Sequence, residues 1–258
     1  MKRFLSLVLI LSIILTASVF AADILYPNAA GKSITIPSAM GAYGNRAFVA
    51  MGLVIDQPYG SSSQNNDANA VLGYGIGNPY KDVGVSITAM ITDLSDLNDY
   101  TFGFHICKYL GEGWTAGIGG EKFAHIGAGQ STVQSYYLVF SHAHQDKKSD
   151  HTHWASKVHY SIGIGSGRFY EAAEQSVNAG KPQYGTAVFA GFSYEIHKHV
   201  NVNLEWSGLD ASAGISFPIN FIKIKGHHLT TSIGILNFTN RDADRTSYVI
   251  SVGSSFGL

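Results

Sequence analysis

Charged side chains are scarce in this sequence. Asp, Glu, Lys and Arg make up 14% of the 258 residues, against roughly 25% in an ordinary soluble domain. The formal net charge of -1 and the pI near 6.8 give the chain no overall field that would attract nucleic acid. The composition therefore argues against nucleic-acid binding and against a protein whose surface is mainly exposed to water.

Cysteine and long apolar runs are nearly absent as well. The single Cys107 excludes an intramolecular disulfide. Beyond the N-terminal residues, no uninterrupted apolar run reaches the roughly 20 residues that a membrane-spanning helix needs. If the chain crosses a membrane, it must do so with strands, whose backbone groups are satisfied in a closed hydrogen-bonded ladder.

The N-terminus has the three parts of a secretory signal peptide. Lys2 and Arg3 precede an apolar run over residues 4–15, and small residues follow to Ala21 and Ala22. We predict a signal peptide over residues 1–21, cleaved after Ala21. The alternative, an uncleaved membrane anchor, would need a longer apolar core.

Many segments of the sequence alternate between apolar and polar residues with a period of two. The segment over residues 200–207 is typical, with Val200, Val202, Leu204 and Trp206 on one face and polar residues on the other. We predict about twelve such strands, at residues 47–55, 70–76, 83–91, 100–107, 114–119, 132–142, 153–165, 184–195, 200–206, 212–217, 229–235 and 248–256. Glycine (29 residues) and aromatic residues (12%) are plentiful, as in membrane barrels with aromatic girdles.

The predicted connections alternate in length. Those at 56–69, 92–99, 123–131, 166–183 and 237–245 are long and polar, whereas those at 77–82, 110–113 and 196–199 are short. A short link near Asp210 and a longer one over 221–227 depart from this pattern. Before the first strand, residues 22–45 contain Pro27 and Pro37 and only a hint of a strand. They are a periplasmic lead-in, a small plug inside the barrel, or disordered.

The last strand ends the chain with an aromatic pattern. Tyr248 and Phe256 share a face, with Gly253 between them, and the final residue is Leu258. In this the chain resembles Gram-negative outer-membrane β-barrel proteins, which usually end in such a strand, most often with Phe last. The resemblance covers residues 46–258 and the signal. It implies an antiparallel transmembrane up-and-down β-barrel, outer-membrane lipid and the outer-membrane assembly machinery as partners, and Tyr248, Gly253 and Phe256 as an assembly signal.

A histidine cluster is the most conspicuous polar feature. His142, His144, His151 and His153 form two His-x-His pairs across one connection. Residues i and i+2 of a strand share a face, so a hairpin could bring all four imidazoles to one zinc or copper ion. A one-residue slip in register would separate them, and the alternative is a solvated histidine-rich turn.

Two other sets of residues carry candidate chemistry. Ser141 beside His142, and His159 near Ser161, supply the residue types of a lipid hydrolase, but adjacent strand residues face opposite sides and no acidic partner is evident. The predicted lumen-lining residues are His105, Lys157, His159, Glu195 and Glu205. They either pair with one another or line a narrow polar path.

We therefore expect an all-β outer-membrane barrel that is a narrow pore for a small polar solute or a structural envelope protein, and not an enzyme. No cofactor is expected, because Gly163, Gly165 and Gly167 alternate within a strand instead of opening a helix. Two alternatives remain open: a barrel-embedded lipid hydrolase, and a soluble exported β-protein that binds a ligand.

Overall fold

The computed structural model describes residues 25–27, 33–56, 66–92, 94, 99–127, 133–224, 227–241 and 245–257. The predicted signal peptide at 1–21 and the final Leu258 lie outside these ranges. So do residues 22–24 and 28–32, so the predicted division of the chain at residues 22–45 stays a prediction.

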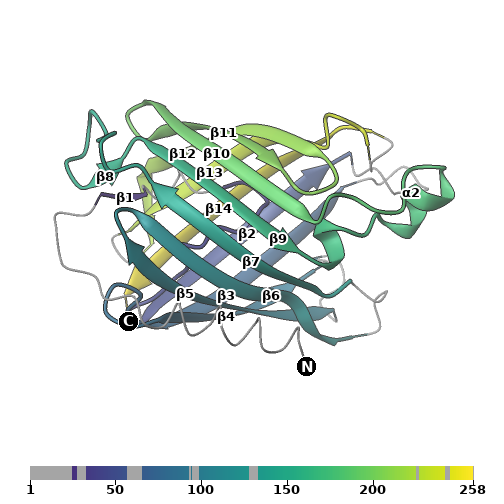
Figure 1. The fold of residues 1–258 in the computed structure, drawn as a ribbon, viewed down its shortest axis with the longest axis horizontal. Helices are drawn as coiled ribbons and strands as arrows, with labels where there is room; N and C mark the ends of the chain where they lie inside the picture. The colour runs from purple at the N-terminus through teal and green to yellow at the C-terminus, as the bar shows by residue number, and fades with distance from the viewer. Residues whose placement is uncertain are drawn as a thin grey trace.

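The chain forms one closed antiparallel barrel of twelve strands, each paired with its neighbours in sequence (Figure 1). The predicted fold class is confirmed. The strands of the barrel are β2 (Arg46–Ile55), β3 (Asp67–Gly77), β4 (Gly84–Ile91), β5 (Tyr100–Gly111), β6 (Trp114–Ile126), β7 (Ser135–Ala143), β9 (Val158–Gly165), β10 (Val188–His197), β11 (Val200–Trp206), β12 (Ala211–Ile224), β13 (His227–Leu236) and β14 (Ser247–Gly257). The ring closes where β14 pairs with β2, from Tyr248 opposite Ile55 to Gly257 opposite Arg46.

The apolar faces of the strands point out of the barrel. Leu53, Ile250, Ile233 and Ile215 are successive cross-strand partners on four adjacent strands, and each is between 37% and 44% exposed. The inward face carries Ser, Thr, Asn, Gly and a few charged residues. A soluble ligand-binding barrel has the reverse arrangement, because its outer face meets water.

The two rims of the barrel differ. The long-loop rim holds the connections at residues 56–66, 92–99, 127–134, 166–187, 207–210 and 237–246, and the short-turn rim holds those at 78–83, 112–113, 144–157, 198–199 and 225–226. β12 continues to Ile224, so the longer link predicted over 221–227 is wrong; the register shift between Ile219 and Lys223 accommodates the extra residues.

Two predicted strands begin four or five residues later than expected, and the sixth begins three residues later, at Ser135. The seventh starts at Val158, because residues 144–157 fold over the short-turn rim and contribute β8 (Ala155–Ser156), which pairs in parallel with β1 (Tyr26–Pro27). The side-chain amide of Gln145 extends this pairing by bonding both the N–H and the carbonyl of Leu25. The eighth starts at Val188, because the connection before it forms η1 (Gly167–Phe169) and α2 (Glu174–Asn178).

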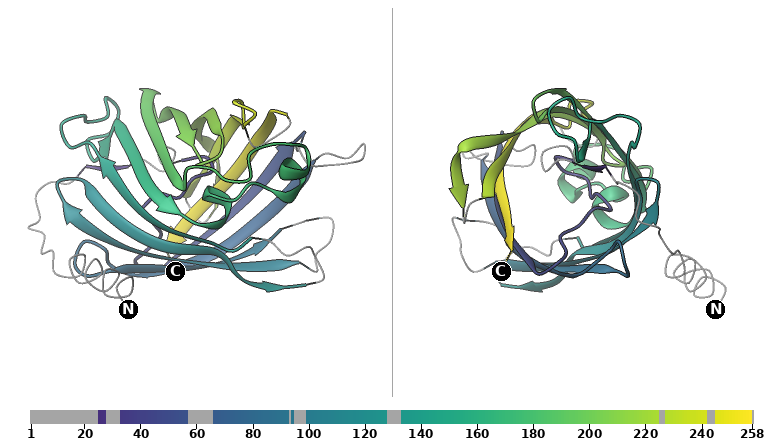
Figure 2. Two further views of the ribbon diagram at one scale, coloured as in Figure 1. Left: turned by 45° about the vertical axis from the view of Figure 1, so that its right-hand side comes forward. Right: turned by 90° about the vertical axis from the view of Figure 1, so that its left-hand side faces the viewer.

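Residues 33–45, here called the lumen segment, run inside the ring of strands (Figure 2). They pass from Ile34, beside the long-loop half of β11, to the short-turn rim, where β2 begins. Gly44 (φ 68°) and Asn45 (φ 56°) adopt left-handed backbone conformations that turn the chain into β2. The barrel wall and the lumen segment together form the candidate functional site.

Candidate functional site in the barrel lumen

The carboxylate of Glu205 on β11 binds the backbone of the lumen segment. Its Oε1 accepts a hydrogen bond from the N–H of Ile34. Its Oε2 accepts from the N–H (2.9 Å) and hydroxyl (2.7 Å) of Thr35 and, at 3.4 Å, from the N–H of Ile36. Successive N–H groups directed at one anion form a nest that stabilises its charge. Glu205 is 6% exposed, so the hydrogen bonds of the nest stabilise its buried charge. They also hold the lumen segment against the barrel wall.

Arg168, in η1, connects the lumen segment to a second strand. Its guanidinium pairs with both carboxylate oxygens of Glu121 on β6, with 2.9 Å between Nη2 and Oε1. Nη2 also donates to the carbonyl of Thr35 at 2.9 Å. Glu121, Arg168, Thr35 and Glu205 thus form a continuous polar bar across part of the lumen. Two-point Arg–carboxylate contacts are among the stronger polar interactions in proteins.

A second set of polar contacts holds the segment nearer the short-turn rim. The Nε2–H of His105 donates to the carbonyl of Ala39 at 3.1 Å, and Nδ1 lies 3.0 Å from the hydroxyl of Tyr137. A carbonyl can only accept, so Nε2 carries a proton. The N–H of Ala39 donates to Ser141 Oγ (2.9 Å), which also bonds Ser161 Oγ (2.6 Å).

Apolar packing fills the lumen between these two sets. Ile36 and Ala39 of the segment form one buried cluster with Val139, Phe169 and Phe189, with Tyr137 packed beside it. Phe169 is brought there by the connection between β9 and β10, which folds inward from the long-loop rim. Part of the barrel interior is therefore an apolar core that the lumen segment helps to form.

The inward glycines make room for the segment. A Cβ on Gly191 would lie 2.6 Å from Ile36 Cδ1, one on Gly117 would lie 3.1 Å from Ala39 Cα, and one on Gly75 would lie 2.4 Å from the carbonyl carbon of Ala42. The space beside these glycines is therefore occupied by the lumen segment.

The predicted lumen residues divide into two groups. His105, His159, Glu195 and Glu205 are buried on inward faces. Lys157 lies outside the strands on the short-turn rim, where its ammonium pairs with Asp150 and sits 5.7 Å from the ring centre of the outward-facing Tyr194. The hydrogen bond from Lys157 lowers the pKa of Asp150.

Sequence reasoning did not single out Glu121, Tyr137 or Arg168. Tyr137 could have been found, because it is in phase with the inward-facing residues of its predicted strand. Glu121 continues the inward phase of the strand predicted at 114–119, but it lies two residues beyond the predicted end. Arg168 belongs to a loop and has no periodic signal, so its position depends on how the loop folds.

The four predicted metal ligands are not gathered at one point. His142 lies on the outer face of β7 against Trp114 and Tyr160, with its Nε2–H donated to the carbonyl of Glu112. Its ring is 5.6 Å from that of His144, while the ring of His151 is 5.6 Å from that of His197 at the end of β10, and His153 is an exposed residue of the rim loop. Over the described ranges, His, Cys, Asp and Glu nowhere form a group of three or more that could hold a metal ion.

The residues considered for a hydrolase are also separated. Ser141 points inward and His142 outward, and His159 Nε2 donates to the carbonyl of Ser156. A hydroxyl–imidazole–carboxylate sequence does occur at the short-turn rim, where Thr152 Oγ1 is 3.1 Å from His199 Nε2 and His199 Nδ1 is 3.6 Å from Glu195 Oε1. Glu195 Oε1 also accepts the backbone N–H of His199, and these contacts join the rim loop to the turn.

No family model matches the chain, and a search of curated proteins gives no match. Among solved structures, the chain is similar to outer membrane phospholipase A from Escherichia coli (11% identity, 90% of this chain and 93% of that one, TM-score 0.43). It is also similar to the KdgM porin in complex with disordered oligogalacturonate (11% identity, 81% and 99% coverage, TM-score 0.46). One neighbour is an enzyme and the other a porin, and likeness at this level does not decide between them. Among the described residues, no helix has the length and apolar character needed to span a bilayer.

Proposed function

We propose that this chain is an integral outer-membrane β-barrel that offers a narrow path to small polar solutes, with the lumen segment as its plug. The ring of exposed apolar side chains supports a lipid-facing outer surface. The main observation in support of a plug is that Glu205 binds three successive backbone N–H groups of the lumen segment. Polar contacts of this kind can be exchanged for water, whereas a purely apolar core would stay closed.

On this proposal the long-loop rim faces outward from the cell and the short-turn rim faces the periplasm, as in bacterial outer-membrane barrels. The N-terminal signal would direct export, and Tyr248, Gly253 and Phe256 on β14 would be read by the assembly machinery. Fractionation of cells that express the full chain, with heat-modifiable migration on a gel, tests the location. Recovery in the soluble fraction without detergent would contradict it.

Planar-bilayer conductance tests the path itself. We expect the intact barrel to be closed for most of the time, with brief openings of small conductance. A pair of cysteines, Ala39→Cys with Ser141→Cys in a Cys107→Ala background, joins the segment to the wall where Ala39 N is 2.9 Å from Ser141 Oγ. Openings should disappear under oxidant and return with reductant.

The results of these experiments distinguish a plugged pore from a structural envelope protein and from an enzyme. Openings that continue in the oxidised protein would remove the plug from the proposal. A complete lack of conductance, also after the segment is loosened by Glu205→Gln, would remove the pore and leave a structural role in the envelope. Hydrolysis of a chromogenic ester lipid by the wild type, lost in Thr152→Ala, would favour an enzyme instead.

A further inference from the structure

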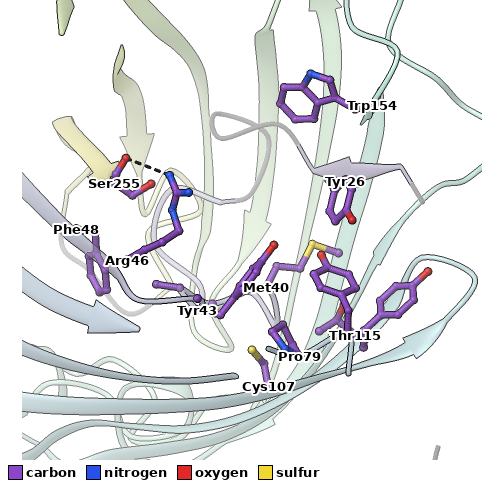
Figure 3. Close-up of a pocket in the computed structure, with 15 residues that line it drawn as sticks. Tyr26, Met40, Tyr43, Arg46, Phe48, Pro79, Cys107, Thr115, Trp154 and Ser255 are labelled. Atoms are coloured by element: carbon purple, nitrogen blue, oxygen red, sulfur yellow. Dashed lines mark hydrogen bonds between the residues drawn. The ribbon is translucent and has the colours of Figure 1, made fainter. Parts of the chain in front are cut away.

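A pocket of about 660 Å³ opens where the lumen segment meets the short-turn rim (Figure 3). The segment provides one side, including Met40 and Tyr43, and the barrel provides the other, including Arg46, Phe48 and Tyr109. The volume falls within the range that holds small organic ligands. The polar bar and the apolar cluster described above do not contribute to it.

Tyrosine rings dominate the wall of this pocket. Tyr80 lies at the centre, with ring centroids 5.3 Å from Tyr26, 5.6 Å from Tyr43 and 5.0 Å from Tyr109. The first two contacts are edge-to-face, the geometry that aromatic quadrupoles favour. Trp154, from the rim loop, adds a further ring. Such a wall offers both faces and edges to a flat ring.

One positive charge lies in the same pocket. Arg46 has a hydrogen bond from Nη2 to the carbonyl of Ser255, at 3.4 Å. The ion pairs of the described residues join other groups and leave Arg46 without a carboxylate. A guanidinium presents several N–H groups in a planar fork that matches a carboxylate. The charge of the pocket therefore complements an anion.

We propose that this pocket binds a small aromatic carboxylate from the periplasmic side, with its ring among the tyrosines and its carboxylate on Arg46. A neutral ring would lose the contact with the guanidinium. An aliphatic acid would keep that contact but lose the aromatic packing. Because Met40 and Tyr43 belong to the lumen segment, a bound acid also holds the segment in its docked position.

Calorimetric titration of the folded protein in neutral detergent micelles tests the site. The probes are 2-naphthoate, the neutral 2-naphthalenemethanol and the ring-free octanoate, each corrected for partition into protein-free micelles. We expect 2-naphthoate to bind about tenfold or more tightly than either of the others, since it alone makes both contacts. Equal binding of octanoate or of the alcohol would overturn the proposal, as would no saturable binding of 2-naphthoate.

Matched variants assign the binding to these residues. Arg46→Gln should weaken 2-naphthoate by about tenfold or more, whereas Arg245→Gln, at an exposed pair with Asp56 on the other rim, should leave it unchanged. Tyr80→Leu should weaken binding, and Tyr184→Leu, which loses a stacked pair at the long-loop rim, should not. Heat-modifiable migration verifies that each variant is folded. The measurement needs no ion flow, so its outcome is separate from that of the conductance experiment.

Discussion

Replacing Glu205 by Gln should loosen the lumen segment without opening the barrel wall. The carboxylate accepts four hydrogen bonds from Ile34, Thr35 and Ile36. Glutamine has one acceptor oxygen, so its NH2 group must face at least one backbone N–H, and every remaining bond loses its charge assistance. Strand β11 is unaffected, because its ladder bonds are made by the backbone.

The magnitude follows from the number of bonds changed. A hydrogen bond to a charged group contributes about 1.5–3 kcal/mol and a neutral one about 0.5–1.5 kcal/mol. Glu205 is 6% exposed, so solvent screens these bonds little. The lost bond alone costs about 1.5–3 kcal/mol, and the loss of charge assistance in the three other bonds adds to this, so the change weakens docking of the segment by at least about 2 kcal/mol. The undocked population should rise by a factor of about 30 or more.

Amide hydrogen exchange of the protein in micelles measures this population directly. The exchange rate of the peptide that contains Ile34, Thr35 and Ile36 should increase by about 30-fold or more, while peptides from β11 stay protected. Glu112→Gln is the control, because Glu112 is an exposed residue in the turn between β5 and β6. Unchanged exchange in folded Glu205→Gln would refute the reasoning that the carboxylate holds the segment.

Three further outcomes are expected. Gly75→Ala should displace the lumen segment, at a cost of about 1–3 kcal/mol, because the added Cβ would meet the backbone of Ala42. Gly257→Ala is the control, since nothing lies within 4 Å of a Cβ at that position. Equal rates of proteolysis within residues 33–45 in the two variants would contradict this prediction. Burial raises the pKa of Tyr80 above the usual value of about 10. As the pH rises, the unfolded state loses this proton before the folded state does, so the contribution of Tyr80 to the free energy of unfolding is full below about pH 10 and falls above it. Tyrosinate absorbance measures the titration curves of the folded and the unfolded protein, and Tyr80→Phe should reduce the difference between the two curves. An unchanged difference would refute the assignment to Tyr80. Zinc titration by calorimetry should give no site tighter than about millimolar, since among the described residues no three His, Cys, Asp or Glu side chains form a group that could hold a metal ion; tighter binding would restore the metal hypothesis.

The predictions from sequence were most accurate where a residue's role depends on strand periodicity. Alternation alone placed Leu204 on the apolar face of its strand, and this face points outward in the structure. Strand ends were less accurate where a connection has structure of its own. Trp154 illustrates this, since it follows the alternation of the seventh strand in sequence yet lies in the rim loop beside Tyr26.

The candidate site was predicted in part. His105 and Glu205 were expected to face the lumen, and both do, but their partners are backbone groups of the lumen segment and not the other inward charges. A backbone N–H has no sequence signature, so contacts of this kind cannot be found from residue types. The roles of Arg168 and Phe169 were not predicted either, because a loop can fold inward or outward with the same composition.

The sequence by itself determined about twelve strands, each with one apolar face, because the side-chain period of two is a local property of each segment. The scarcity of charge favoured a membrane barrel, while the closed ring and its apolar outer face became certain only in the tertiary structure. Only the tertiary structure decided what occupies the interior. Whether inward glycines leave an open path or receive another part of the chain depends on contacts between residues far apart in sequence, such as Ile36 with Gly191. Those contacts require the closed ring, and here they place residues 33–45 inside it.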